Sequence, residues 1–435
     1  MQRPRNARED FCFTAARPSA PLYNSCVHAS GPSAASRLPV PPLWLLVLIT
    51  ISGTMAMHMF VPALPDAAQR LATSTGEMQM AISIYIGGLA AGQLIYGPLS
   101  DAFGRRPMLM WGLALYAIGS VAAALAPGLH VLLAARLVQA LGGCAGLALG
   151  RAIVRDTSQA DTAVRQLALL NLMIMIGPGF APVIGGAVSA AFGWRAIFVL
   201  LAVAGAVTLW FTWRLLPETS KPTGNFGVRV LLSDYKALLG SPRFVGFALG
   251  GGSATTCVYA FLSAAPFIFV NELHEPVQRV GLYAGLMVLG MAVGNALTSR
   301  FARTVPAARL IRIGNTLSLV SALVLLAIVL TGRLTLFNAI GVMLFFTCGS
   351  GMTSPAALAK AVSVDPQRIG SASGLYGCTQ MGIGAACTAL AALGADPARS
   401  ALTVMVVASA LAQVAFTVAL RDERKANWPA PPRSP

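Results

Sequence analysis

The stretch Gly97-Pro-Leu-Ser-Asp-Ala-Phe-Gly-Arg-Arg-Pro107 joins two long apolar runs and carries more information on the fold than any other part of the chain. Its first glycine permits close approach of a neighbouring helix, and Gly104 permits a tight turn of two or three residues. We expect Arg105 and Arg106 to face the anionic inner leaflet of a membrane, with Asp101 placed to pair with a cation or a helix N-terminus. This spacing predicts a specific cytoplasmic loop between two membrane spans.

The composition agrees with a membrane protein. Apolar residues make up 56% of the 435 residues, whereas Asp, Glu, Lys and Arg together make up only 11%. An average soluble protein has about 25% of these charged residues, so this chain has too few to cover a soluble surface. That excludes a cytosolic enzyme, a disordered chain and a secreted disulfide scaffold. Twelve spans of roughly 20 residues would need about 240 apolar residues, which is close to the number present.

The apolar runs follow one another at regular spacing and predict twelve membrane-spanning helices in two groups of six. Their approximate ranges are 43–64, 78–99, 107–126, 130–150, 166–190, 195–215, 244–269, 280–299, 309–330, 334–356, 370–393 and 399–419. The fold class predicted is therefore an all-α membrane protein.

Three segments lie outside the spans. Residues 1–42 are rich in proline and serine and predict a disordered cytoplasmic tail, because no apolar run begins early enough for a signal peptide. Residues 217–242 form the longest polar stretch within the spanning region and predict a cytoplasmic linker, and residues 421–435 predict a second cytoplasmic tail. The chain is thus divided into two six-helix halves, 43–216 and 243–420.

The lysines and arginines predict that both termini lie in the cytoplasm. With that orientation the inner segments hold 25 of the 31 basic residues, the outer loops hold five, and one, Arg136, lies within a span. The opposite orientation would reverse the bias of the positive-inside rule. The net charge of +16 therefore reflects membrane topology, and no nucleic-acid partner is needed to explain it.

A faint internal repeat supports the two halves. The stretch 97–105 after the second span and the stretch Asn295-Ala-Leu-Thr-Ser-Arg-Phe-Ala-Arg303 after the eighth share Leu, Phe and a final Arg at an offset of 198 residues. Two repeated halves with a binding site between them at mid-membrane are a recurring transporter architecture.

Neither a cofactor nor a metal site is predicted. The chain lacks the GxxxxGK[ST] sequence of many ATP-hydrolysing proteins, so transport would use a gradient or a partner. Its seven cysteines form no CxxC pair and lie mostly in apolar stretches, where we expect them to be small packing residues. We expect no enzymatic activity.

The fifth predicted span contains Gly177-Pro-Gly-Phe-Ala-Pro-Val-Ile-Gly-Gly186. Pro178 and Pro182 free backbone carbonyls and kink a helix. Gly185 and Gly186 let a neighbouring helix lie close. The segment is either a tightly packed span or one with a special role in conformational change.

Arg136 lies in the fourth span and is followed by Gln139. A guanidinium at mid-span costs roughly 2.5–3.5 kcal/mol on insertion scales. Arg136 must therefore be buried inside the bundle with hydrogen-bond partners, as part of a functional network or as a packing residue.

His58, near the end of the first span, is the one conspicuous titratable group there. With the ranges above, all fifteen acids fall in tails, loops or span ends, so no acid lies at mid-membrane. A proton-coupled carrier needs a group that gains and loses a proton, and histidine does this near neutral pH. His58 is our candidate for proton coupling, although a histidine on an apolar face can also be an ordinary core residue.

The loop 97–107 closely resembles the signature cytoplasmic loop of the major facilitator superfamily, and Arg136 with Gln139 resembles the Arg-x-x-Gln-Gly motif of its fourth helix. The fifth span resembles the Pro-x-x-Gly-Gly antiporter signature of its drug exporters, a motif associated with export coupled to proton uptake. The resemblance implies the major facilitator fold and a gating role for these motifs.

Five further stretches, 55–65, 92–101, 192–198, 259–267 and 370–374, carry a closer resemblance. Over about residues 43–420 the chain resembles the twelve-helix drug:proton antiporters of the bicyclomycin-resistance (Bcr/CflA) group. In that group the position of His58 is usually Asp.

The family architecture implies a substrate cavity among the first, fourth, seventh and tenth helices. A lining of methionine and aromatic side chains would suit varied amphipathic compounds, because thioethers adapt in shape. The candidates for substrate contact are Met55, Met59, Phe60, Tyr259, Phe261 and Gln380.

From the sequence we therefore expect a monomeric carrier in the bacterial inner membrane, surrounded by lipids, that exports small amphipathic compounds in exchange for protons by alternating access. A facilitator that imports a metabolite, or a uniporter, is the nearest alternative, and the missing membrane acid favours it mildly. A passive channel and a non-transporting sensor are more distant alternatives.

Overall fold

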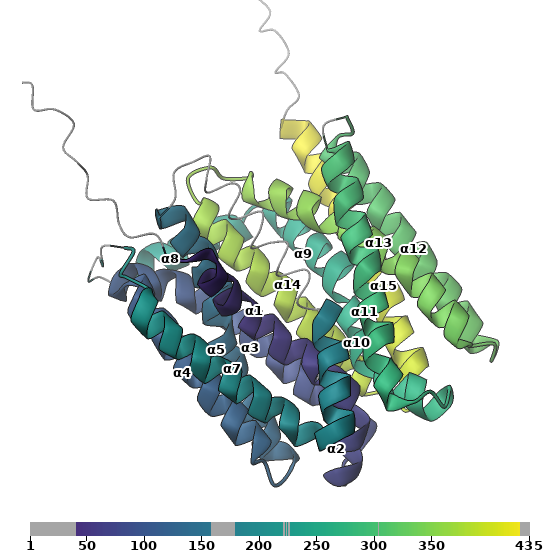
Figure 1. The fold of residues 1–435 in the computed structure, drawn as a ribbon. Coiled ribbons are helices and arrows are strands. Elements are labelled where there is room, and N and C mark those ends of the chain that lie inside the picture. The colour runs from purple at the N-terminus through teal and green to yellow at the C-terminus, as the bar shows by residue number, and fades with distance from the viewer. Residues whose placement is uncertain are drawn as a thin grey trace, which may run out of the picture. The chain divides into compact units, whose positions relative to one another are not determined.

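The computed structural model describes residues 41–157, 179–220, 222, 224, 227–302 and 304–426, and these residues form helices and connecting loops without any strand (Figure 1). The predicted tails therefore lie largely outside the described residues, as does Pro178. The helices of the first half are α1 (Leu43–Met59), the 3₁₀ turn η1 (Val61–Ala63), α2 (Leu64–Arg70), α3 (Thr75–Phe103), α4 (Arg105–Ala124), α5 (Leu129–Thr157), the helix Gly179–Phe192 and α7 (Trp194–Leu215).

The second half has a similar series of helices after a short one in the linker. They are α8 (Val228–Leu239), α9 (Pro242–Thr256), α10 (Val258–Phe267), the π-helical turn η2 (Ile268–Glu272), α11 (Val277–Phe301), α12 (Ala307–Leu330), α13 (Leu336–Val362), α14 (Ile369–Ala392) and α15 (Pro397–Ala426). Ten helical segments of the described chain are long and apolar enough to cross a membrane. The shorter apolar helix Gly179–Phe192 and α14 lie at the other two predicted spans, so the all-α prediction is confirmed.

Polar residues at several helix starts explain where those helices begin. Ser74 accepts a hydrogen bond from the backbone N–H of Glu77, whose carboxylate accepts one from the Ser74 N–H in return. The side-chain hydroxyl of Ser241 caps α9 by accepting a hydrogen bond from the backbone N–H of Phe244. Pro242 follows as the first helical residue, where a backbone N–H would have no partner within the helix, so the lack of one in proline has no energetic cost. These caps satisfy backbone donors that would otherwise lack partners at the helix ends.

Two predicted spans are interrupted rather than continuous. The first is broken after Met59, where Pro62 and Pro65 cannot donate to the helical ladder. The seventh is broken at Cys257, between α9 and α10. Interrupted helices at membrane depth are tolerated where protein surrounds the freed backbone groups.

Helices α3 and α14 pack against each other along their length, so residues far apart in sequence lie side by side (Figure 1). At one end a Cβ added to Gly76 of α3 would collide with the carbonyl oxygen of Ala392. Towards the other end a Cβ added to Gly377 of α14 would collide with the side chain of Gln93. This pair of helices joins the first half of the chain to the second.

The predicted linker 217–242 contains a helix, α8, which was not predicted from the sequence. Asp234 of α8 accepts hydrogen bonds from Arg368 Nε (2.8 Å) and Ser371 Oγ (3.0 Å) beside the start of α14. The Tyr235 hydroxyl donates to the backbone carbonyl of Leu94 in α3 at 3.5 Å. The linker helix is therefore attached to both members of the α3–α14 pair.

The ion pair between Arg368 and Asp365, beside the start of α14, is expected to weaken in acid. Arg368 also donates a hydrogen bond to Asp365, and this bond lowers the pKa of the Asp365 carboxyl. Because that pKa is lower in the folded chain, the stabilisation is complete above the ordinary carboxyl value of about 3.9 and is lost as the pH falls through the lowered pKa. We expect Asp365→Asn to lower the Tm at pH 7 and to lower it by less as the pH falls below the ordinary carboxyl pKa of about 3.9, in thermal unfolding followed by tryptophan fluorescence. Asp396→Asn, which alters another exposed ion pair, is the matched control; a Tm loss for Asp365→Asn that is as large in acid as at pH 7 would contradict the assignment.

Candidate functional site

His58 lies in the last turn of α1 with only 4% of its surface exposed. Its Nδ1 is 2.8 Å from the carbonyl oxygen of Thr54. Because a carbonyl only accepts hydrogen bonds, Nδ1 carries the hydrogen, and the lone pair of the neutral ring is on Nε2. In the described part of the chain Nε2 has no hydrogen-bond partner. The ring is therefore oriented so that Nε2 can take up a proton.

Side chains from both halves meet at His58. The ring of Tyr259 in α10 lies with its centroid 6.2 Å from that of His58. Met55 of α1, Tyr259 and Met381 of α14 are partly buried and pack against the same apolar cluster. Beside Met381, the Gln380 amide donates to the hydroxyl of Thr255 at 2.8 Å. We call the region of His58 and Tyr259, together with Met55, Gln380 and Met381 on the same helices, the α1–α10–α14 junction.

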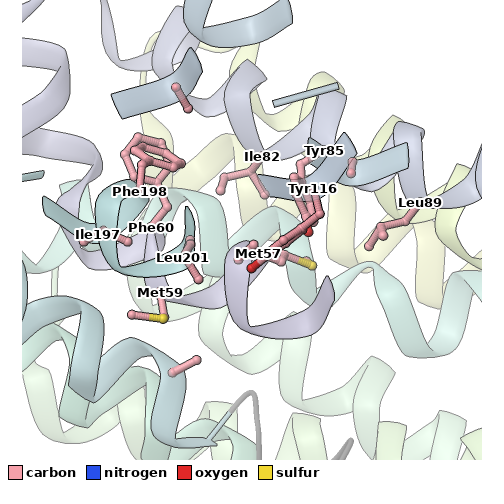
Figure 2. Packing of buried hydrophobic residues seen from close by; sticks show 14 of the residues in the cluster. Met57, Met59, Phe60, Ile82, Tyr85, Leu89, Tyr116, Ile197, Phe198 and Leu201 are labelled. Carbon is pink, nitrogen blue, oxygen red and sulfur yellow. The ribbon is translucent and has the colours of Figure 1, made fainter. Parts of the chain in front are cut away.

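Three of the residues expected to contact substrate lie outside this junction. Met59 and Phe60 are 1% and 0% exposed, and Figure 2 shows Phe60 beside Phe198, with ring centroids 4.9 Å apart. Phe261 is also buried, in a separate apolar cluster of the second half. The structure gives these three side chains packing contacts in the cores of the two halves.

Arg136 is fully buried, which agrees with the expectation from its cost in a membrane span. Its Nη1 donates to the carbonyl of Ala56 (3.0 Å) and to the side chain of Gln139 (2.7 Å), and the ring centroid of Tyr85 is 3.9 Å from its guanidinium carbon. Gln139 in turn donates to Ser120. The guanidinium and Gln139 thus link α1, α3, α4 and α5 through hydrogen bonds and a cation–π contact.

The described part of the fifth predicted span packs closely on two neighbours. A Cβ added to Gly185 would collide with the carbonyl oxygen of Met59, just where α1 ends. On α11, a Cβ added to Gly281 would collide with the carbonyl oxygen of Pro182. Gly186 lies between these contacts, close to Pro62. The helix Gly179–Phe192 therefore forms a second contact between the halves.

The loop after α3 turns at a single residue, Gly104, whose φ of +101° favours glycine. The side chain of Arg105 is turned inward rather than towards the leaflet, and it pairs with Asp101 (2.6 Å) and Asp156 (3.0 Å). The expectation that Arg105 faces lipid headgroups is wrong because these carboxylates bind it within the protein. The expectation that Gly97 permits close helix approach is also wrong, since a Cβ at that position would meet no neighbouring atom.

Glu218 is a partner of this loop that was not predicted from the sequence. Its carboxylate accepts hydrogen bonds from the backbone N–H groups of Arg105 (2.9 Å) and Arg106 (3.2 Å) at the start of α4. The Arg106 side chain donates to the carbonyl of Trp213 at 2.8 Å. The only sequence signal was a single acid directly after the sixth span, and nothing in the sequence pairs it with a loop more than 100 residues away.

Glu218→Gln is expected to weaken the start of α4. The amide would lose the negative charge that stabilises the positive end of the helix, together with part of its acceptor capacity, at a cost of roughly 1–2 kcal/mol. Thermal unfolding of the purified protein should show a lower Tm than the wild type. Glu272→Gln, which alters an exposed acid of η2, is the control and should leave the Tm unchanged; a Glu218→Gln protein as stable as this control would rule out the capping role.

The sequence pattern of the Major Facilitator Superfamily matches this chain over residues 46–389. The chain belongs to the major facilitator superfamily. It is therefore a multi-pass membrane protein of a superfamily of transporters rather than enzymes, as the sequence predicted.

The chain also resembles known proteins in sequence and a solved structure in fold. The chain is 28% identical over 387 residues to a bicyclomycin resistance protein homolog of Haemophilus influenzae, covering 86% of this chain and 95% of that protein. It is 34% identical over 202 residues to multidrug resistance protein D of Escherichia coli, covering 46% and 51%. A bacterial homolog of the lysosomal transporter Spinster, solved in an inward-facing and unoccupied conformation, shares the fold with a TM-score of 0.69 at 17% identity, covering 89% and 98%.

Proposed function

We propose that this facilitator exports small amphipathic compounds, drugs among them, across the bacterial inner membrane in exchange for protons, by alternating access. The relatives named for bicyclomycin and multidrug resistance support export of drugs. The observation that carries the proposal is the buried His58 of the first half, whose ring lies beside that of Tyr259 of the second half. A titratable group at such a junction can change its surroundings when the halves move.

The two halves, 43–216 and 243–420, would rock against each other about the helix pairs that join them, with 217–242 as the cytoplasmic linker. Both termini would lie in the cytoplasm, which the distribution of lysine and arginine supports. The protein would act as a monomer among membrane lipids.

Proton and substrate would compete for the α1–α10–α14 junction. When the junction opens outward, Nε2 of His58 would take up a proton, and the resulting positive charge would disfavour a bound amphipathic compound next to Tyr259. When it opens inward, loss of the proton would restore a neutral, adaptable surface that includes Met55 and Met381. Exchange follows because the two ligands are bound in different states of the same site.

The motif residues would serve the movement itself. The ion pairs of Arg105 with Asp101 and Asp156 would hold the cytoplasmic loop in one of the two states, with Arg106 anchored beside them. Arg136 would keep the first half rigid. Pro182, Gly185 and Gly186 would shape the second contact between the halves, whereas Pro178 lies outside the described residues.

The proposal is tested with purified protein in liposomes that contain a pH-sensitive dye. Addition of chloramphenicol-like or cationic amphipathic compounds across an imposed pH gradient should drive proton movement that saturates with substrate. Substrate movement without proton movement would overturn antiport and favour a uniporter or importer. If neither substrate nor protons move, the export proposal itself fails.

A further inference from the structure

One flank of the linker helix α8 is apolar, basic and uncovered in the described chain. Leu232 and Leu239 are 60% and 57% exposed, and Arg229 and Lys236 are part of the same flank. At 3.6 residues per turn these four positions fall within about 80° of the helix circumference. Two exposed leucines thus lie beside two cations on one side of the helix.

The opposite side of α8 is attached to the rest of the protein. This attachment fixes the rotation of α8 about its axis and therefore keeps the flank on the outside. Leu238 is 2% exposed and belongs to an apolar cluster of the second half. Asp234 bonds to Arg368 and Ser371 beside α14, and Tyr235 bonds to α3. The uncovered flank is therefore held in place and cannot turn inward to bury its leucines.

The chain also keeps α8 at the membrane surface. The helix ends at Leu239, and the membrane-spanning segment that begins with α9 starts at Pro242, so only Gly240 and Ser241 separate them. A short amphipathic helix at this level lies where apolar side chains reach the acyl boundary and Lys or Arg side chains reach lipid phosphates. The exposed flank contains side chains of both kinds.

We propose that the flank formed by Arg229, Leu232, Lys236 and Leu239 binds the surface of an anionic phospholipid bilayer. The leucines enter the boundary between headgroups and acyl chains, and the two cations contact phosphate groups. Because Asp234 and Tyr235 attach α8 to α14 and α3, bilayer binding would tether both of these helices to the inner leaflet. This interaction is independent of the substrate and of proton coupling.

The geometry is tested by placing a fluorescent non-natural amino acid at position 232 or, in a second protein, at 230. Val230 is the matched control, since it is 67% exposed and lies roughly 160° away around the helix. In liposomes containing phosphatidylglycerol, we expect nitroxide-labelled lipid to quench the probe at 232 and aqueous iodide to quench the probe at 230. Iodide quenching at both positions would overturn the proposal and leave the flank for a soluble partner.

The charge requirement is tested with Arg229→Gln and Lys236→Gln in the protein labelled at 232. Each cation near an anionic surface contributes about 1 kcal/mol, so each substitution should weaken lipid docking roughly fivefold. The phosphatidylglycerol content needed for half-maximal quenching should rise accordingly. Arg421→Gln, an exposed cation of α15, should not change it; equal behaviour of all three variants would overturn the role of the two cations.

Discussion

His58→Ala is expected to abolish substrate-driven proton movement while substrate still exchanges down its own gradient. Alanine removes the one imidazole that presents an unpaired ring nitrogen at the α1–α10–α14 junction in the described chain. Without a proton acceptor there, substrate and proton no longer compete, and the two fluxes separate. The measurement follows internal pH and radiolabelled substrate in the same liposomes. Proton flux on addition of substrate should fall to the level seen without substrate.

Two further substitutions separate titration from packing. His58→Asp keeps a titratable group and is expected to retain part of the coupling, whereas His58→Gln keeps a polar side chain that cannot take up a proton and should behave like alanine. His130→Ala is the matched control, because His130 lies at the start of α5, away from the junction. Coupled flux retained by both His58→Ala and His58→Gln would show that His58 is a packing residue and that coupling resides elsewhere.

The spans could be predicted from sequence because a membrane sets their length and polarity almost alone. The same criterion says nothing of where a span breaks, so the interruptions after Met59 and at Cys257 were not predicted. The criterion of span length and polarity also misses α8, because a linker of mixed polarity is not apolar enough to be recognised as a helix from its sequence. Its helix is stabilised by contacts of its apolar side with other parts of the protein. Leu238 is buried only because the second half supplies a cluster for it.

The sequence allowed us to predict which types of side chain the candidate site would contain, but not the direction in which each side chain points. Met55 and Met59 are one helical turn apart, yet Met55 is only partly buried whereas Met59 is 1% exposed, because the chain turns after Met59 and places its carbonyl oxygen against Gly185. The direction of the Arg105 side chain was also predicted wrongly, because the sequence shows a basic residue in a loop but not the carboxylates that bind it. Asp156, which pairs with Arg105, and Glu218, which caps α4, are both far from Arg105 in the sequence. Contacts between such distant residues cannot be predicted from the spacing of residues in one sequence.

Arg136→Gln is expected to destabilise the protein more than Glu218→Gln or Asp365→Asn. Glutamine is shorter and uncharged, so the carbonyl of Ala56 and the side chain of Gln139 would both lose the guanidinium donor in a fully buried site. Removing such buried partners and their packing costs roughly 2–4 kcal/mol. Thermal unfolding in detergent should show a Tm well below that of the wild type.

The accompanying variants distinguish charge from shape at this position. Arg136→Lys keeps the charge but offers one compact ammonium in place of the planar guanidinium, so it cannot lie over Tyr85 and bridge Ala56 to Gln139 together. We therefore expect Arg136→Lys to be almost as unstable as Arg136→Gln. Arg421→Gln, which alters an exposed arginine of α15, should stay within about 0.5 kcal/mol of the wild type. A stable Arg136→Gln protein that no longer transports would contradict a structural role and assign Arg136 to the transport cycle itself.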